Sequence, residues 1–136
     1  MPQDYTRPHV LVVEDHPVFR RFLLSWLSRS FHVSAVADGF EALRWLQSGN
    51  RPDVVVLDMD MPRISGVQFL RNLRFSGIFS DLPVVAVSSL TEAEVREKVA
   101  EYHVSDVFPK PYQPAALLAA INSAVAAPAE PALAAA

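Results

Sequence analysis

Hydrophobic and polar positions follow two patterns along the chain. Continuous aliphatic runs occur at 10–13, 54–57 and 84–87. Between such runs, apolar residues recur three and four positions apart, which is typical of amphipathic helices. Uninterrupted aliphatic runs are typical of strands that are buried on both faces of a sheet. The pattern therefore predicts an alternation of buried strands and helices.

Five strand–helix pairs are expected. The predicted strands cover 9–15, 31–37, 53–58, 82–89 and 105–109. The predicted helices are one that begins at Pro17, followed by 38–49, 65–77, 91–103 and 113–126. Strands that are joined by helices run parallel, and parallel sheets are covered on both faces. The sequence thus indicates an α/β fold.

The first helix carries the largest aromatic content. Pro17 suits a first helical turn, and Asp15 just before it is a candidate N-cap. The apolar residues of this helix are expected to face the core, namely Phe19, Phe22, Leu23, Trp26 and Leu27.

Composition narrows the possible functions. A length of 136 residues fits one domain, and a hydrophobic content of 51% can fill its core. The net charge of −3, without a block of Lys or Arg, argues against binding to nucleic acid or to an anionic membrane. The absence of cysteine excludes thiolate metal sites and cysteine nucleophiles.

The ends of the chain differ from its centre. We expect a folded domain at 9–126, a disordered lead-in at 1–8 and an Ala/Pro-rich tail or linker stub at 127–136. No apolar run approaches the roughly 20 residues of a membrane helix. The first residues also lack the basic start and apolar core of a secretory signal. A cytoplasmic location is the resulting expectation.

Polar residues with chemical potential follow the predicted strands. Because the carboxyl ends of parallel strands meet at one edge of a sheet, these residues are expected to form one pocket. They are Glu14, Asp15, Asp58, Asp60, Ser88 and Lys110. Carboxylates that lie close together repel each other unless a cation neutralises them. The oxygen ligands favour Mg²⁺, and the absence of Cys and His at these strand ends disfavours zinc.

An aspartate whose negative charge is balanced by a metal ion can attack phosphorus and form an aspartyl phosphate. The hydroxyl of Ser88 and the ammonium of Lys110 can then bind the oxygens of the added group. With these residues the chain resembles the receiver domain of two-component response regulators, of the chemotaxis-regulator type, over about 10–125. The spacing of Ser88 and Lys110 from Asp58 carries the resemblance, and Pro62 and Gly66 fit it as well.

The resemblance implies a fold and a set of roles. The fold is the doubly wound, flavodoxin-like (βα)₅ fold, with a five-stranded parallel sheet in the order 2-1-3-4-5 and helices on both faces. Asp58 resembles the phosphoacceptor, Ser88 the switch hydroxyl and Lys110 the phosphate-binding cation. The peptide bond between Lys110 and Pro111 is often cis in this family.

The resemblance also implies a metal site and partners. Mg²⁺ is expected to be held by Asp58, by Asp15 directly, by Glu14 through water and by the backbone carbonyl of Asp60. The phosphoryl donor is expected to be a sensor histidine kinase or a histidine phosphotransfer protein. A downstream protein is expected on the face formed by the fourth helix, fifth strand and fifth helix. No nucleic acid or membrane partner is expected, and the chain is expected to be a monomer or a phosphorylation-dependent dimer.

One departure from the family leaves a further hypothesis open. Val107 lies three positions before Lys110, where the family usually has Tyr or Phe that rotates inward in active forms. A β-branched side chain cannot make that movement, and Phe108 is expected to face the opposite side of the sheet. One alternative is therefore a receiver-like module that binds partners without phosphorylation.

A second alternative is an enzyme. The Asp-x-Asp motif formed by Asp58 and Asp60 also occurs in haloacid-dehalogenase-type phosphatases, where it follows the first strand. Here an acidic pair precedes the motif, so a phospho-accepting receiver is favoured. It is expected to be no enzyme beyond its own phosphotransfer and autodephosphorylation.

Overall fold

A computed structural model describes residues 7–126 as a sheet of five parallel strands with five helices. The strands are β1 (His9–Val13), β2 (His32–Val36), β3 (Val54–Asp58), β4 (Val84–Ser88) and β5 (Asp106–Pro109). The helices are α1 (Pro17–Leu27), α2 (Gly39–Gln47), α3 (Gly66–Phe75), α4 (Glu92–Lys98) and α5 (Pro114–Ala126). The predicted tail at 127–136 and most of the predicted lead-in at 1–8 lie outside the described residues.

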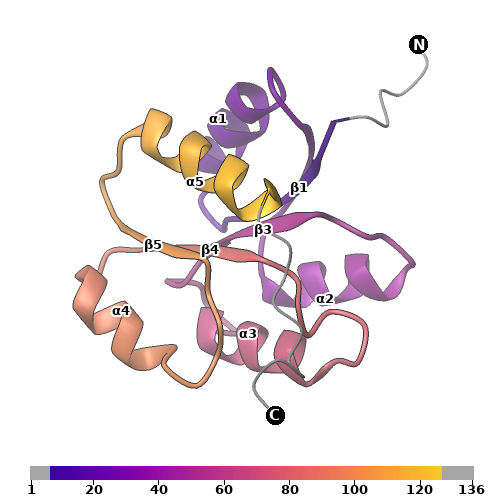
Figure 1. Ribbon diagram of the computed structural model, residues 1–136, viewed down its shortest axis with the longest axis vertical. Coiled ribbons are helices and arrows are strands. Elements are labelled where there is room, and N and C mark those ends of the chain that lie inside the picture. Colours follow the sequence, from indigo (N-terminus) through magenta and orange to yellow (C-terminus); the bar gives the residue numbers. More distant parts are fainter. Residues whose placement is uncertain (1–6, 127–136) are drawn as a thin grey trace.

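The strand order is β2-β1-β3-β4-β5, and all neighbouring strands are parallel. Helices α1 and α5 cover one face of the sheet, while α2, α3 and α4 cover the other (Figure 1). The predicted doubly wound fold is thereby confirmed. Every residue of β3 and of β4 is buried, which explains why the aliphatic runs in the sequence are continuous.

The register of the strands sets the position of the polar pocket. Val13 of β1 pairs with Leu57 of β3, and Asp58 pairs with Val87 of β4. Glu14, Asp58 and Ser88, which follow Val13, Leu57 and Val87, therefore reach the same edge of the sheet. Burial of the aliphatic side chains stabilises this register, at roughly 1.5–3 kcal/mol for each fully buried Val or Leu. A slip of one residue would turn every side chain of a strand to the opposite face.

The start of α1 differs from the sequence prediction. His16, and not Asp15, is the N-cap, because its Nδ1 atom accepts a hydrogen bond from the backbone N–H of Phe19 at 3.5 Å. Pro17 occupies the first helical turn as expected. The carboxyl group of Asp15 lies instead among the acids that follow β1 and β3. The side chain of Asp15 cannot cap α1 and join these acids at the same time, and in the structure it joins the acids.

The expected burial of aromatic residues in α1 is also wrong in part. Leu23 and Leu27 are buried, but the side chains of Phe19 and Phe22 are 56% and 46% exposed. Trp26 is partly buried against the core. Only a narrow stripe of α1 contacts the sheet, so apolar residues outside that stripe face solvent.

Helix α4 is shorter than the predicted 91–103. Thr91 caps it by accepting a hydrogen bond from the backbone N–H of Glu94, and the helix ends at Lys98. Beyond it, the backbone N–H of Tyr102 donates to the carbonyl of Val99 at 2.8 Å in a turn. Tyr102 packs against the core on this side of the sheet. This tertiary packing ends a helix that periodicity alone would continue.

None of the helices that the structure describes combines the length and the apolar character that crossing a lipid bilayer requires.

A pair of stacked histidines joins the edge strand β2 to β1. The rings of His9 and His32 are 4.2 Å apart between centroids, and Trp45 packs edge-on against His9. Nε2 of His9 shares a 2.8 Å hydrogen bond with Ser34 Oγ, and the carboxylate of Asp53 accepts from the backbone N–H of His9. Burial and then the neighbouring imidazole lower the pKa of His9, and Asp53 opposes this shift. The folded state therefore favours the neutral ring.

Gly66 allows α3 to start close to the loop after β3. A Cβ atom at Gly66 would lie 2.6 Å from Met59 Cα and 2.7 Å from Met59 Sδ. Alanine is normally better than glycine within a helix by about 1 kcal/mol. Contact with the Met59 backbone reverses that preference here.

We expect Gly66→Ala to lower the free energy of unfolding by about 1–3 kcal/mol, because the loop after β3 must shift to admit the methyl group. Gly77→Ala is the matched control, since nothing lies within 4 Å of a Cβ atom there. Chemical denaturation of both variants measures the difference. Equal stability of the two variants would contradict this packing.

Acidification is expected to weaken the His9 contact. Because the folded state binds a proton less readily than the unfolded chain, the free energy of unfolding should fall as the pH decreases through about 6.5. His9→Gln should show a smaller fall between about pH 7.5 and about pH 5.5, measured by urea denaturation at each pH. The same fall in both proteins would show that His9 is not responsible.

Candidate functional site

Three carboxyl groups meet at the carboxyl edge of the sheet. Glu14 and Asp15 follow β1, and Asp58 ends β3; one oxygen of each lies within 4.8 Å of the others. The side chain of Asp58 is 1% exposed, and Glu14 is also buried. Among the residues that the structure describes, the buried side-chain oxygens without a hydrogen-bond partner are Glu14 Oε2 and Asp58 Oδ2. Two buried acceptors without donors are the arrangement that a cation would satisfy.

The proximity of these acids shifts their protonation. Burial, followed by the nearby Asp58, raises the pKa of Glu14 to about 8 and raises the pKa of Asp15 as well. Burial alone would raise the pKa of Asp58. The neighbouring Glu14, the amide of Asp60 and the ammonium of Lys110 nevertheless hold the pKa of Asp58 below its ordinary value. Of the two buried acids of the cluster, Glu14 and Asp58, it is therefore Asp58 that stays ionised.

Lys110 is held beside Asp58 by the end of β5. Its backbone N–H donates to the carbonyl of Ser88 at 2.7 Å, and its Nζ atom donates to Asp58 Oδ1 at 3.0 Å. The peptide bond between Lys110 and Pro111 is cis, as the resemblance implies. Burial lowers the pKa of Lys110, but the bond to Asp58 outweighs it and the pKa is raised overall. The ammonium group is thus charged and directed at the acid.

Ser88 and Asp60 complete the pocket. Ser88 ends β4, is fully buried and donates its hydroxyl hydrogen to Asp60 Oδ1 at 2.8 Å. The backbone N–H of Asp60 donates to Asp58 Oδ1 at 2.9 Å. The structure therefore brings together all six site residues proposed from the sequence. It also gives the Asp60 side chain contacts that the sequence prediction, limited to its backbone carbonyl, did not include.

Two further residues near the pocket were not predicted. Arg20 donates from its Nη1 atom to the backbone carbonyls of Glu14, at 3.0 Å, and Asp15, at 3.3 Å. Tyr112 follows Lys110, and burial together with the charge of Glu14 raises its pKa. The sequence did contain a signal for Arg20, because it lies one turn into the helix that follows the acidic pair. No sequence signal pointed to Tyr112.

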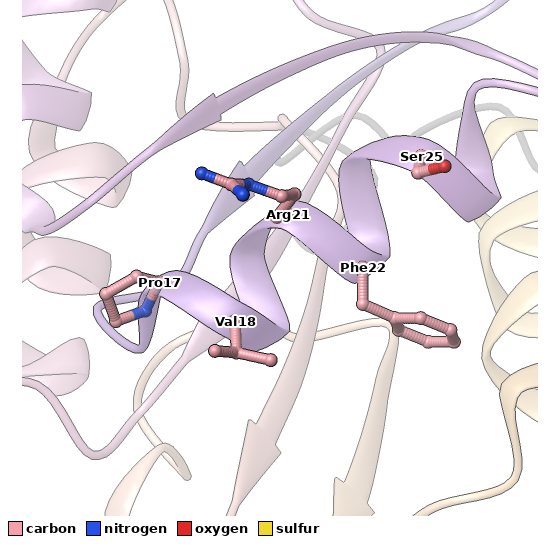
Figure 2. Close-up of a pocket in the computed structure, with 5 residues that line it drawn as sticks. All are labelled: Pro17, Val18, Arg21, Phe22 and Ser25. Carbon is pink, nitrogen blue, oxygen red and sulfur yellow. The ribbon is translucent and has the colours of Figure 1, made fainter.

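The exposed side of α1 lies next to this pocket along the chain. A hollow there is lined by Pro17, Val18, Arg21, Phe22 and Ser25, as Figure 2 shows. The side chain of Val18 is 70% exposed. Exposed apolar side chains that gather on one surface are typical of a protein contact site.

Chemically, the pocket offers an ionised nucleophile, a cation, a hydroxyl donor and a set of oxygen ligands. The family model for the response regulator receiver domain matches residues 10–122. The chain belongs to the response regulator receiver domain family. Its strand order and the geometry of its pocket agree with this assignment.

The relatives of this receiver domain are signalling proteins. It is 32% identical over 117 residues to the hybrid signal transduction histidine kinase D of Dictyostelium discoideum, covering 86% of this chain and 8% of that protein. It is 36% identical over 115 residues to the response regulator MprA of a Mycobacterium species, covering 84% of this chain and 49% of that protein. The chain thus spans half or less of the length of these relatives.

A solved structure shares the fold and has a metal in its site. This is the receiver domain of a sensor histidine kinase from Pseudomonas aeruginosa, with a magnesium ion coordinated in the active-site cleft. It matches with a TM-score of 0.79 and 25% identity, over 89% of this chain and 99% of that one. The receiver domain described here is accordingly a phospho-accepting module of two-component signalling, and the alternatives considered from the sequence are not favoured.

Val107 and Phe108, neighbours in β5, lie on opposite faces of the sheet. Val107 is buried in the core between the sheet and α2, α3 and α4, whereas Phe108 packs on the opposite face with α1 and α5. The ring of Phe108 lies 6.5 Å from that of Tyr112. The expectation that Phe108 faces away from Val107 is confirmed.

Proposed function

We propose that Asp58 accepts a phosphoryl group from the phosphohistidine of a sensor histidine kinase or a histidine phosphotransfer protein. The observation that carries this proposal is the state of the Asp58 carboxylate. It is almost fully buried, stays ionised and is in contact with Lys110, yet its Oδ2 atom lacks any hydrogen-bond donor among the described residues. A structural ion pair would normally satisfy both oxygens of so deeply buried a carboxylate.

The reaction needs no further group from the chain for its balance. A carboxylate oxygen of Asp58 forms a bond to phosphorus while the phosphorus–nitrogen bond of the phosphohistidine breaks. The electron pair of that bond stays on the imidazole nitrogen, and the product is an acyl phosphate. We propose that Lys110 and the hydroxyl of Ser88 bind the phosphoryl oxygens, which carry a charge of about −1.5 to −2. Hydrolysis resets the domain: the oxygen of a water molecule bonds to phosphorus, the bond between phosphorus and the Asp58 oxygen breaks, and inorganic phosphate leaves the regenerated carboxylate.

The acids fit a divalent cation. Glu14, Asp15 and Asp58 would hold Mg²⁺ together with the backbone carbonyl of Asp60, and the two buried oxygens without donors support this set. When bound, Mg²⁺ supplies charge neutralisation between the carboxylates and the incoming phosphoryl group. Arg20 donates hydrogen bonds to the backbone carbonyls of the acidic pair, and we infer that it thereby orients their side chains.

The surface next to the pocket supports a protein as the phosphoryl donor. The start of α1 follows the acidic pair closely in the chain, and its residues Val18, Phe19 and Phe22 are exposed. An exposed apolar surface of this kind is typical of a contact with another protein and would not be needed to bind a small phosphate donor.

For the downstream partner we propose the face formed by α4, β5 and α5. A second hollow on this face lies between the loop before β5 and small side chains of α5. Phosphorylation-dependent dimerisation through it is the alternative to a monomer. No nucleic acid contact is proposed, and the cytoplasmic location stays a prediction.

Incubation with Mg²⁺ and acetyl phosphate is expected to add one phosphoryl group to the chain, because acetyl phosphate supplies the same activated phosphorus as phosphohistidine. Intact-protein mass spectrometry measures the addition, and peptide mapping locates it. Asp58→Asn should abolish it, whereas Asp81→Asn, at the opposite edge of the sheet, should not. An unmodified wild-type chain, or modification that survives Asp58→Asn, would falsify the assignment.

Mg²⁺ should raise the melting temperature of the chain, because a ligand that binds the folded state alone stabilises it. Arg20→Ala should weaken Mg²⁺ binding by roughly tenfold or more, as the loss of a group that orients metal ligands does elsewhere. Arg21→Ala removes the same charge from the neighbouring, exposed position and is the control. Calorimetric titration compares the three proteins, and equal affinities would show that Arg20 does not orient the acids.

A further inference from the structure

The side chain of Asp60 uses both of its oxygens within the pocket. Oδ1 accepts the hydroxyl hydrogen of Ser88 at 2.8 Å, and Oδ2 accepts the backbone N–H of Ser89 at 2.6 Å. The ammonium of Lys110 lies 3.7 Å from Oδ2 while it donates to Asp58. One carboxylate thus gathers a hydroxyl, an amide and a cation.

These donors are the ones that a phosphoryl group on Asp58 requires. Lys110 already contacts Asp58, and Ser88 ends the strand next to it in the sheet. A serine hydroxyl has a single hydrogen to donate, so Ser88 cannot serve Asp60 and a phosphoryl oxygen at the same time. Ser89 N–H has the same limit.

The charges lead to the same conclusion. A phosphoryl group on Asp58 carries about −1.5 to −2 and would lie beside the negative carboxylate of Asp60. Two anions that share one set of donors repel each other and compete for it. A neutral side chain at this position would impose neither penalty.

We propose that the Asp60 carboxylate is an internal competitor for the phosphoryl group, and this rests on the proposed function of Asp58. In the resting chain it binds Ser88, Ser89 and Lys110 in place of the phosphoryl oxygens. Phosphorylation must displace it, which frees both serine donors together. Asp60 therefore determines how strongly the site holds a phosphoryl group, in addition to the backbone carbonyl that it offers to the cation.

The test is the affinity for beryllofluoride, a phosphoryl analogue, in the presence of Mg²⁺. Asp60→Asn keeps the size and the backbone of the residue but removes its charge. A lost charge-assisted hydrogen bond corresponds to about a tenfold change or more, so Asp60→Asn should bind beryllofluoride about tenfold more tightly than the wild type. Asp81→Asn, which removes one exposed carboxylate elsewhere, should bind like the wild type. Asp60→Ala serves as a second variant if Asp60→Asn does not fold.

A second readout needs neither metal nor analogue. In the metal-free chain the amide proton of Ser89 should resonate downfield and exchange slowly, and Asp60→Asn should reverse both properties. Tighter binding together with this change supports the competitor. Equal affinities of wild type and Asp60→Asn overturn it while the function of Asp58 stands. Failure of every protein, wild type included, to bind beryllofluoride overturns the proposed function and the competitor with it.

Discussion

Charge burial at one edge of a parallel sheet is the constraint on which the site depends. Glu14 and Asp58 are held out of water, and within residues 7–126 the ammonium group that contacts Asp58 is that of Lys110. Isolated charges in such a place would be strongly unfavourable, so the chain responds by protonation of one acid and by an ion pair to the other. A site in this state has capacity for one more cation and for one anionic group beside it. Both requirements of aspartyl phosphorylation follow from the same imbalance.

The topology produces this imbalance by bringing together groups that lie far apart in the sequence. Parallel strands in the order β2-β1-β3-β4-β5 place the ends of β1, β3, β4 and β5 along one edge. Each strand then contributes one kind of group, and the aliphatic register below fixes their spacing. Arg20 adds support from the helix side, and the Asp60 carboxylate occupies the remaining donors. The pocket that keeps Asp58 ionised thus also contains a carboxylate, that of Asp60, which occupies the donors that a phosphoryl group on Asp58 would need.

Much of this could be predicted from the sequence, for physical reasons. The runs at 10–13, 54–57 and 84–87 have no amphipathic reading, so they had to be buried strands. Once the strands are parallel, their carboxyl ends must meet. Side-chain detail was less accessible: the capping of α1 by His16 and the exposure of Phe22 depend on which groups compete in three dimensions. The contact between Asp60 and Ser88 belongs to the same class, because spacing along the chain does not set where a carboxylate turns.

The most direct measurement is a crystal structure of the chain grown with Mg²⁺ and beryllofluoride. The account predicts beryllium bonded to a carboxylate oxygen of Asp58, fluorine atoms in contact with Ser88 and Lys110, and a metal ion against Glu14 and Asp15. Crystals in which Asp58 remains paired with Lys110 alone, with beryllium absent or bound elsewhere, would contradict it.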